Sequence, residues 1–183
     1  MKKVLNRKLQ VIKLLAEWYV LHVRTGEETN VRDYIKREIP QIKALAPRRE
    51  MKERKDGIWR TRIRTLFPGY VFINSLMTVD EYYKLSNIGG VINILKGASS
   101  SPSPIPEEEM EIILRLSRDN DLVGITDLVI DGDNIKVVTG PLEGYEGQIL
   151  KVDRHRLRAR VKFTLLGQEK CVDLGINVIE KIG

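Results

Sequence analysis

The sequence predicts an α+β fold in two parts, an α/β sandwich followed by a small five-stranded β-barrel. Up to about residue 118, the spacing of apolar residues gives the order strand, helix, hairpin, strand, helix, strand, helix, which is typical of such a sandwich. From about residue 129 only short strands follow one another, as they do in a small barrel. With 183 residues, 42% of them hydrophobic, the chain can bury two modest cores.

The predicted sandwich begins with a strand and a helix. Trp18–Val23 is rich in aromatic and β-branched residues, which favour strands, and the Thr25-Gly26 pair ends it. Over Glu27–Ile39 apolar side chains recur at helical spacing, and Pro40 cannot continue a helix. We therefore expect one helix between these two points.

The next segment, Arg48–Arg64, is predicted to form a basic hairpin. Two alternating stretches flank Asp56-Gly57, a pair that favours the tight turn between antiparallel strands. The segment carries eight basic and three acidic residues. It is either an exposed basic arm or an edge strand that charge protects from pairing with other chains.

The other elements of the sandwich follow from apolar runs and from the residues that interrupt them. A continuous apolar run indicates a central strand, Gly89-Gly90 ends a helical stretch, and the Ser/Pro-rich segment 97–104 is a loop by composition. The expected elements are a strand at Tyr70–Ile73, a helix at 79–85, a strand at 91–95, and a helix from Glu107 to about Arg118.

The barrel is predicted from five short strands. They are expected at 134–139, 148–152, 157–165, 169–174 and 178–182. Polar residues and Gly124 weaken the elements on either side of 119–126, which favours a linker there. The predicted organisation is an N-terminal extension at 1–16, a first domain at 17–118, a linker at 119–128 and a second domain at 129–183.

The net charge of +6 and the isoelectric point near 9.4 favour an anionic partner. Charge alone does not separate nucleic acid from a membrane surface or from simple solubility. The surplus lies in residues 1–16, which carry five basic residues and no acid, whereas 126–183 carry nine of each sign. Residues 1–16 are predicted to form an amphipathic helix. It either packs on the protein or merely extends from it, and the alternative is a membrane-surface role. We expect no membrane-spanning segment.

Catalysis and metal binding are not expected. One cysteine, Cys171, and two histidines are too few for a disulfide framework or a four-ligand zinc site, which also favours a reducing, cytoplasmic setting. The chain has no motif of a serine hydrolase, zinc protease or nucleotide-binding phosphate loop, and Gly140, Gly144 and Gly147 have the wrong spacing for such a loop. We therefore predict a binding protein, not an enzyme, with no metal and no cofactor.

The strongest indication of a binding surface is a run in which every second residue is basic. Its members are Arg154, Arg156, Arg158, Arg160 and Lys162. Leu157, Ala159, Val161 and Phe163 have the other parity. In a strand these two sets point to opposite faces, so the apolar set can enter a core while the basic set lines one outer surface.

Two other interpretations of this run remain open. Residues 153–156 could form the turn between two strands, which keeps the basic residues clustered at its tip. The basic side chains could also be a solvated barrel face that pairs with nearby acids. Five cations fall within nine residues, although the whole of 126–183 has a total charge of zero. We therefore favour nucleic-acid contact through phosphates and base edges.

Three ordered segments resemble the signature segments of the NusG family, in which an NGN domain with a mainly antiparallel sheet precedes a KOW barrel. They are Trp18-Tyr19-Val20, then Leu66–Ile73 with the sequence LFPGYVFI, then Gly132–Gly147 with Gly140-Pro141 and Tyr145-Glu146-Gly147. The match covers nearly everything after residue 16.

The resemblance implies that the NGN domain docks on the clamp helices of RNA polymerase through an apolar depression. The residues carried over as polymerase contacts are Phe67, Pro68, Tyr70 and Val91. The alternative is that Pro68-Gly69 is only a turn into a strand and that the aromatic residues belong to a core. The resemblance also implies a monomer.

In housekeeping members of the family, an exposed aromatic residue in the KOW domain binds protein partners. The corresponding position here is Leu166, before Gly167, which departs from that pattern. Residues 23–28 and 48–57 are more similar to the LoaP paralogs, whose KOW domain is associated with RNA hairpins. The expected RNA-binding residues are Arg154, His155, Arg156, Arg158, Arg160, Lys162, Lys136 and Lys151.

The leading hypothesis is therefore a transcription elongation and processive antitermination factor that binds RNA polymerase and a structured leader RNA hairpin. The alternative is a general NusG elongation factor whose KOW domain binds protein partners. A KOW-containing ribosome-associated protein is a third possibility, against which the NGN segments argue.

Overall fold

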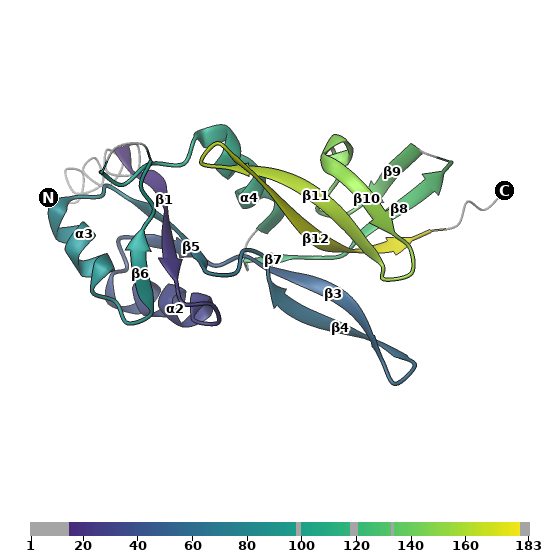
Figure 1. Cartoon of the computed structure of the whole chain (residues 1–183), viewed down its shortest axis with the longest axis horizontal. Helices are drawn as coiled ribbons and strands as arrows, with labels where there is room; N and C mark the ends of the chain where they lie inside the picture. Colours follow the sequence, from purple (N-terminus) through teal and green to yellow (C-terminus); the bar gives the residue numbers. More distant parts are fainter. Residues whose placement is uncertain (1–14, 98–99, 118–120, 133, 180–183) are drawn as a thin grey trace, which may run out of the picture. The chain divides into compact units, whose positions relative to one another are not determined.

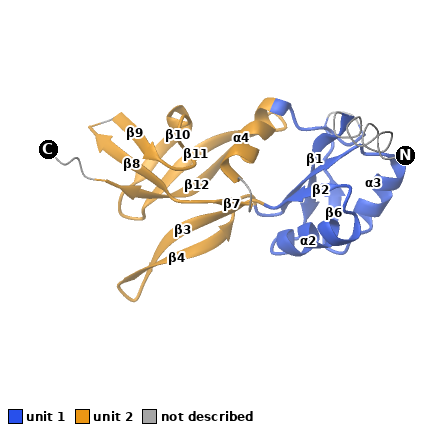
Figure 2. Cartoon of the chain, turned by 180° about the vertical axis from the view of Figure 1, so that it is seen from behind, with its two compact units in different colours: residues 1–46, 68–107 blue, residues 47–67, 108–183 orange. Residues whose placement is uncertain are grey.

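The computed structural model describes residues 15–97, 100–117, 121–132 and 134–179. The chain divides into two compact units, which Figure 2 shows in different colours. Unit 1 consists of residues 1–46 and 68–107, and unit 2 of residues 47–67 and 108–183. The helix expected at 1–16 lies almost wholly outside the described residues, and the contiguous domain boundaries expected from the sequence stay a prediction.

Unit 1 is built on a four-stranded antiparallel sheet with the order β2-β5-β1-β6, in which β1, β5 and β6 are labelled in Figure 1 and β2 in Figure 2. Its strands are β1 (Glu17–Val23), β2 (Lys43–Leu45), β5 (Tyr70–Ser75) and β6 (Val91–Ile94). The continuous apolar run of the central strand β5 is explained by burial on both of its faces, since successive residues of a strand point to opposite faces. Val71, Phe72 and Ile73 are fully buried.

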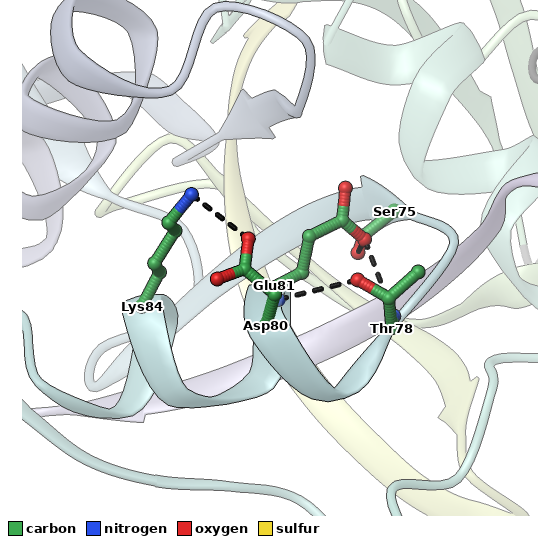
Figure 3. Close-up of polar contacts among 5 residues, drawn as sticks. All are labelled: Ser75, Thr78, Asp80, Glu81 and Lys84. Atoms are coloured by element: carbon green, nitrogen blue, oxygen red, sulfur yellow. Dashed lines mark hydrogen bonds and ion pairs between the residues drawn. The ribbon is translucent and has the colours of Figure 1, made fainter.

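Two helices, α2 (Glu28–Glu38) and α3 (Val79–Ser86), pack with this sheet in the described part of unit 1. Val31 and Ile35 of α2 and Leu85 of α3 join the core of the sheet. A capping box begins α3: the Thr78 hydroxyl accepts from the backbone N–H of Glu81 at 3.3 Å, and the Glu81 carboxylate accepts from the backbone N–H of Thr78 at 3.4 Å (Figure 3). Each pair satisfies an N–H at the helix start that has no partner within the helix.

Unit 2 contains the predicted hairpin, formed by β3 (Arg48–Lys55) and β4 (Ile58–Thr65). Asp56 and Gly57 both have positive φ, 53° and 80°, as the tight turn of a two-residue hairpin requires. The short strand β7 (Leu122–Val123) pairs with β3 in parallel, so β3 lies between β4 and β7. The helix α4 (Glu107–Ser117) belongs to this unit from Glu108 onward.

The rest of unit 2 is a five-stranded sheet with the order β10-β11-β12-β8-β9. Its strands are β8 (Thr126–Asp131), β9 (Asn134–Thr139), β10 (Ile149–Asp153), β11 (Arg158–Leu165) and β12 (Gln168–Val178), with the 3-10 helix η2 (Glu146–Gln148) before β10. A curled five-stranded sheet agrees with the predicted small barrel, and the two units together confirm the α+β class.

The strand predicted at 178–182 lies mostly outside the described residues, and its first residue, Val178, is the last residue of β12. The fifth strand of the described sheet is β8, which begins inside the predicted linker. Residues 176–178 of β12 pair in parallel with Thr126–Leu128. Gly175 lies inside β12 and does not end it. A Cβ at this position would overlap the backbone oxygen of Glu50 in β3. The glycine is needed for this close approach of two backbones.

We therefore expect Gly175→Ala to lower the free energy of unfolding by about 1–3 kcal/mol, since the added methyl group has to push β3 away from β12. Urea denaturation of the full chain measures the loss. Gly147→Ala is the matched control, because a Cβ at Gly147 would meet open space. Equal stability of the two variants would contradict the close approach.

Candidate nucleic-acid interface

The strand β11 separates apolar from basic side chains as its sequence predicts. Ala159, Val161, Phe163 and Leu165 are buried, whereas Arg158, Arg160 and Lys162 lie on the other face of the strand. The alternation is therefore confirmed over residues 158–165.

The structure decides between the two interpretations of the residues before β11. Residues 154–157 form the turn between β10 and β11, so Arg154, His155 and Arg156 do not continue the strand. The Asp153 carboxylate fixes this turn by accepting from the backbone N–H of Arg156 at 2.8 Å. That hydrogen bond, assisted by the charge of Arg156, lowers the pKa of Asp153.

Basic residues from the turn and from two strands come together around a depression of about 180 Å³. It is lined by Lys151, Asp153, Arg156, Arg158, Arg160 and Asp173. Lys151 joins the arginines because it is the partner of Arg160 in the ladder between β10 and β11, so both side chains leave the same face. Four cations and two carboxylates line this depression, which we call the barrel depression, and its charge is positive.

Several of these cations already have partners on the same face. Arg160 Nε lies 3.1 Å from Asp173 Oδ1, Lys162 Nζ lies 2.7 Å from Glu169 Oε1, and Arg156 Nε lies 3.9 Å from Asp153 Oδ2. The hydrogen bond and charge of Glu169 raise the pKa of Lys162. Exposed ion pairs contribute little to stability, so these cations can exchange a carboxylate for a phosphate at low cost.

The structure leaves four of the predicted RNA-binding residues outside the depression. Lys136 is exposed on β9, at the opposite edge of the sheet from β10. Lys162 lies further along β11, beside Glu169, and Arg154 and His155 are exposed in the turn without lining the depression. Lys151, Arg156, Arg158 and Arg160 are the predicted residues that the fold gathers.

Two residues near the depression were not predicted because they come from the hairpin, more than 100 positions earlier. The guanidinium of Arg49 in β3 donates to the backbone oxygen of Asp173. Burial lowers the pKa of Arg49, and repulsion from Arg158 lowers it further while Asp173 opposes this. The charge of Arg158 also acts on Glu53 of β3. No local pattern in the sequence indicates which barrel strand β3 would meet.

The residues expected to contact polymerase are divided between the two units. Phe67, in unit 2, is only 4% exposed and packs edge-on against Phe163 of β11, with 6.0 Å between ring centroids. In unit 1, Pro68 is exposed, Tyr70 is half-buried with its ring edge-on to His22, and Val91 packs partly against the core of that unit. Phe67 thus occupies a core position in this structure.

The turn between β11 and β12 is held by α4. The Glu109 carboxylate accepts from the backbone N–H of Leu166 at 2.6 Å and from that of Gly167 at 3.1 Å. Further along α4, the guanidinium of Arg115 lies 5.1 Å from the centre of the Tyr145 ring. The backbone of Leu166, the position at which the resemblance pointed to an aromatic residue, is therefore engaged within unit 2.

Within the described ranges, no group of three or more His, Cys, Asp or Glu side chains could hold a metal ion. No helix among the same residues is long and apolar enough to cross a membrane.

Comparison with known proteins agrees with the architecture. The profile of the family described as "Transcription termination factor nusG" matches residues 16–114, and that of the KOW motif matches residues 132–162. Proteins called "Transcription termination/antitermination protein NusG" from Staphylococcus aureus strains Mu50 and Newman are each 26% identical over 179 residues, covering 90% of this chain and 95% of theirs. The solved structure described as "Domain interaction in Thermotoga maritima NusG" has a TM-score of 0.57 at 24% identity, covering 93% of this chain and 99% of that chain.

Proposed function

The chain belongs to the NusG family of transcription termination/antitermination factors, and from this premise we propose that it is a processive antitermination factor of the LoaP kind. Its NGN domain binds the clamp helices of RNA polymerase, and its KOW domain binds a structured leader RNA hairpin. Two linked binding sites raise each other's effective concentration, so modest affinities suffice for recruitment.

The observation that carries the RNA half of this proposal is the barrel depression, where Lys151, Arg156, Arg158 and Arg160 meet. Arginine guanidinium groups bind phosphates in a bidentate manner and also reach base edges in loops and distorted stems. Arg156, at the exposed tip of a turn, can reach into an RNA groove from there. The engagement of Leu166 by Glu109 supports the same choice, since this turn presents no aromatic residue to a protein partner.

The alternative function is that of a general NusG elongation factor whose KOW domain binds proteins. The ion pairs Arg160–Asp173 and Lys162–Glu169 favour it, because they describe a solvated face whose charges are already matched. Titration of the full chain with a stem-loop RNA and with an unrelated RNA, each at two salt concentrations, separates the two functions. Preferential, salt-sensitive binding supports the antitermination factor, and weak binding without preference supports the alternative.

Polymerase binding through Phe67 requires that the ring leave Phe163, since a side chain this deeply buried has no surface to offer a partner. The hydrogen bonds from two backbone N–H groups to Glu109 hold α4 at the β11–β12 turn, at the end of the strand that carries Phe163, and oppose this release. The barrel therefore competes with polymerase for Phe67. Binding to polymerase and separation of α4 from the β11–β12 turn are then coupled.

Glu109→Ala is accordingly expected to raise the affinity of the full chain for core RNA polymerase by roughly tenfold, because hydrogen bonds to a charged group contribute about 1.5–3 kcal/mol net. A binding titration with purified polymerase measures the change. Glu108→Ala, on the same helix turn but exposed, is the matched control. An unchanged or lower affinity would show that the barrel contact does not compete with polymerase.

A further inference from the structure

The β3–β4 hairpin is an arm with little packing of its own beyond residue 57. Residues 58–64 of β4 are exposed on both faces, and among the described strands β4 pairs with β3. Figure 1 shows the hairpin extending away from the barrel strands of unit 2. A two-stranded ribbon in water is marginally stable by itself, so an exposed arm of this length is best explained by a ligand that it contacts.

One face of this arm is strongly basic. Arg60, Arg62 and Arg64 alternate along β4, and with Lys55 and Glu53 of β3 they line a second depression, of about 260 Å³, which we call the arm depression. Arg64 forms a bidentate pair with Glu53, at 2.9 and 2.8 Å, while Lys55, Arg60 and Arg62 are exposed. Four cations thus surround a single carboxylate.

The base of the arm is fixed on β12, the strand beside β11. Arg49 donates to the backbone oxygen of Asp173, and Lys52 donates to the side-chain oxygen of Asn177. Between these two contacts, Gly175 allows the backbone of β3 to cross β12 at Glu50. Contacts at three alternate positions of β12 give the arm a defined direction relative to the barrel sheet.

This attachment makes the two depressions neighbours. Asp173 lines the barrel depression, and its backbone oxygen accepts a hydrogen bond from Arg49 of the arm. Glu53 lines the arm depression, where the hydrogen bond from Arg64 lowers its pKa, and the charges of Arg158 in the barrel depression and Arg62 in the arm lower it further. Eight cations from the two depressions therefore form one basic surface, interrupted by Glu53, Asp153 and Asp173.

We propose that the β3–β4 arm is a second RNA-binding element, which holds the phosphate backbone of a double-helical RNA stem that continues from the barrel depression. The inference rests on the proposed function, because it assigns further contacts to the same RNA. The arm gives the complex affinity and orientation, whereas the barrel turn reads the RNA.

The chemistry of the arm favours a duplex over other ligands. Alternate residues of a strand are about 7 Å apart along the backbone, so Arg60, Arg62 and Arg64 leave one face of β4 at regular intervals, which suits a row of phosphates. The basic face carries no aromatic residue, since Trp59 has the other parity, and the stacking platform that single strands need is absent from it. Double-stranded RNA is recognised mainly by its shape and phosphates, which this face can provide.

The test uses the full chain and two stem-loop RNAs with the same loop, one with a short stem and one with a stem long enough to follow the arm. Arg60→Glu/Arg62→Glu is expected to lower the affinity for the long-stem RNA at least tenfold and to leave the affinity for the short-stem RNA within twofold. The slope of log Kd against log salt for the long stem falls by about 1–2, because each phosphate contact accounts for roughly one unit. Arg37→Glu/Lys84→Glu, two exposed cations of unit 1, is the charge-matched control.

Equal binding of both RNAs by wild type and the arm variant would overturn the proposal. So would equal competition by a DNA duplex of the same length, or a loss of polymerase binding with unchanged RNA binding, which would indicate an acidic protein surface as the partner. Failure of the proposed function gives a different pattern: Arg156→Glu/Arg158→Glu would leave the affinity for both RNAs unchanged while the arm variant still lost the long stem. Both positions in the arm variant are exposed, so thermal melting is expected to match wild type.

Discussion

Reversing the charges of Arg156 and Arg158 is expected to lower the affinity of the full chain for a stem-loop RNA by between tenfold and a hundredfold. The two side chains line the barrel depression from the turn and from β11, so the substitution changes its sign near the centre. A hydrogen bond to a charged group contributes about 1.5–3 kcal/mol, and every 1.4 kcal/mol is tenfold in affinity. The measurement is a titration with labelled RNA at two salt concentrations.

The salt dependence of this variant separates a phosphate contact from a change in folding. Loss of two contacts lowers the slope of log Kd against log salt by about 1.4–1.8, whereas a partly unfolded barrel loses affinity with no defined change in slope. Arg37→Glu/Lys84→Glu in unit 1 again carries the same change in net charge. If RNA affinity stayed within twofold of wild type in the reversed variant, the barrel depression would not be the RNA site.

Phe67→Ala is expected to lower the free energy of unfolding by about 3–5 kcal/mol, which makes it the largest stability effect predicted for this chain. Phe67 is nearly inaccessible to solvent, and its ring meets that of Phe163 edge-on at an interplanar angle of 77°. The substitution removes apolar contacts and leaves a cavity beside β11. Urea denaturation measures the loss, and Val138→Ala, at an exposed apolar residue of β9, is expected to cost less than 0.5 kcal/mol.

A double-mutant cycle shows whether Phe67 and Phe163 touch in solution. The two rings are expected to be coupled by about 0.5–1.5 kcal/mol beyond the sum of the single alanine substitutions. Additive effects would mean that the two residues are buried in separate places, and the proposed competition between the barrel and polymerase would then lose its basis. The cycle therefore tests the step on which the Glu109→Ala prediction depends.

The local features of the fold could be predicted from the sequence, because they depend on neighbours in the chain. Asp56-Gly57 specifies a hairpin turn by its backbone conformation, and the apolar run after Tyr70 indicates a buried central strand. The parity of Arg158–Leu165 gave the correct faces of β11. The identity of the family could also be predicted, because three short segments keep their order and spacing along the chain.

The sequence predicted the basic residues that line the barrel depression, but it also included residues that lie elsewhere. Lys151, Arg156, Arg158 and Arg160 do gather, since a ladder partner and a tight turn bring them to one face. Lys136 was included by charge alone, and only the strand order places it at the far edge of the sheet. RNA and polymerase binding by these residues stay proposals that the experiments above decide.

By itself, therefore, the sequence determined the class of the fold, the faces of its strands and the family. Only the tertiary structure decided that Phe67 packs on Phe163 and that Glu109 accepts hydrogen bonds from the β11–β12 turn. It also decided that the hairpin contacts β12 through a hydrogen bond between residues 124 positions apart. The physical reason is one of range. Periodicity and turn chemistry act between residues a few positions apart, whereas contacts between distant segments depend on which surfaces are complementary once each segment has folded.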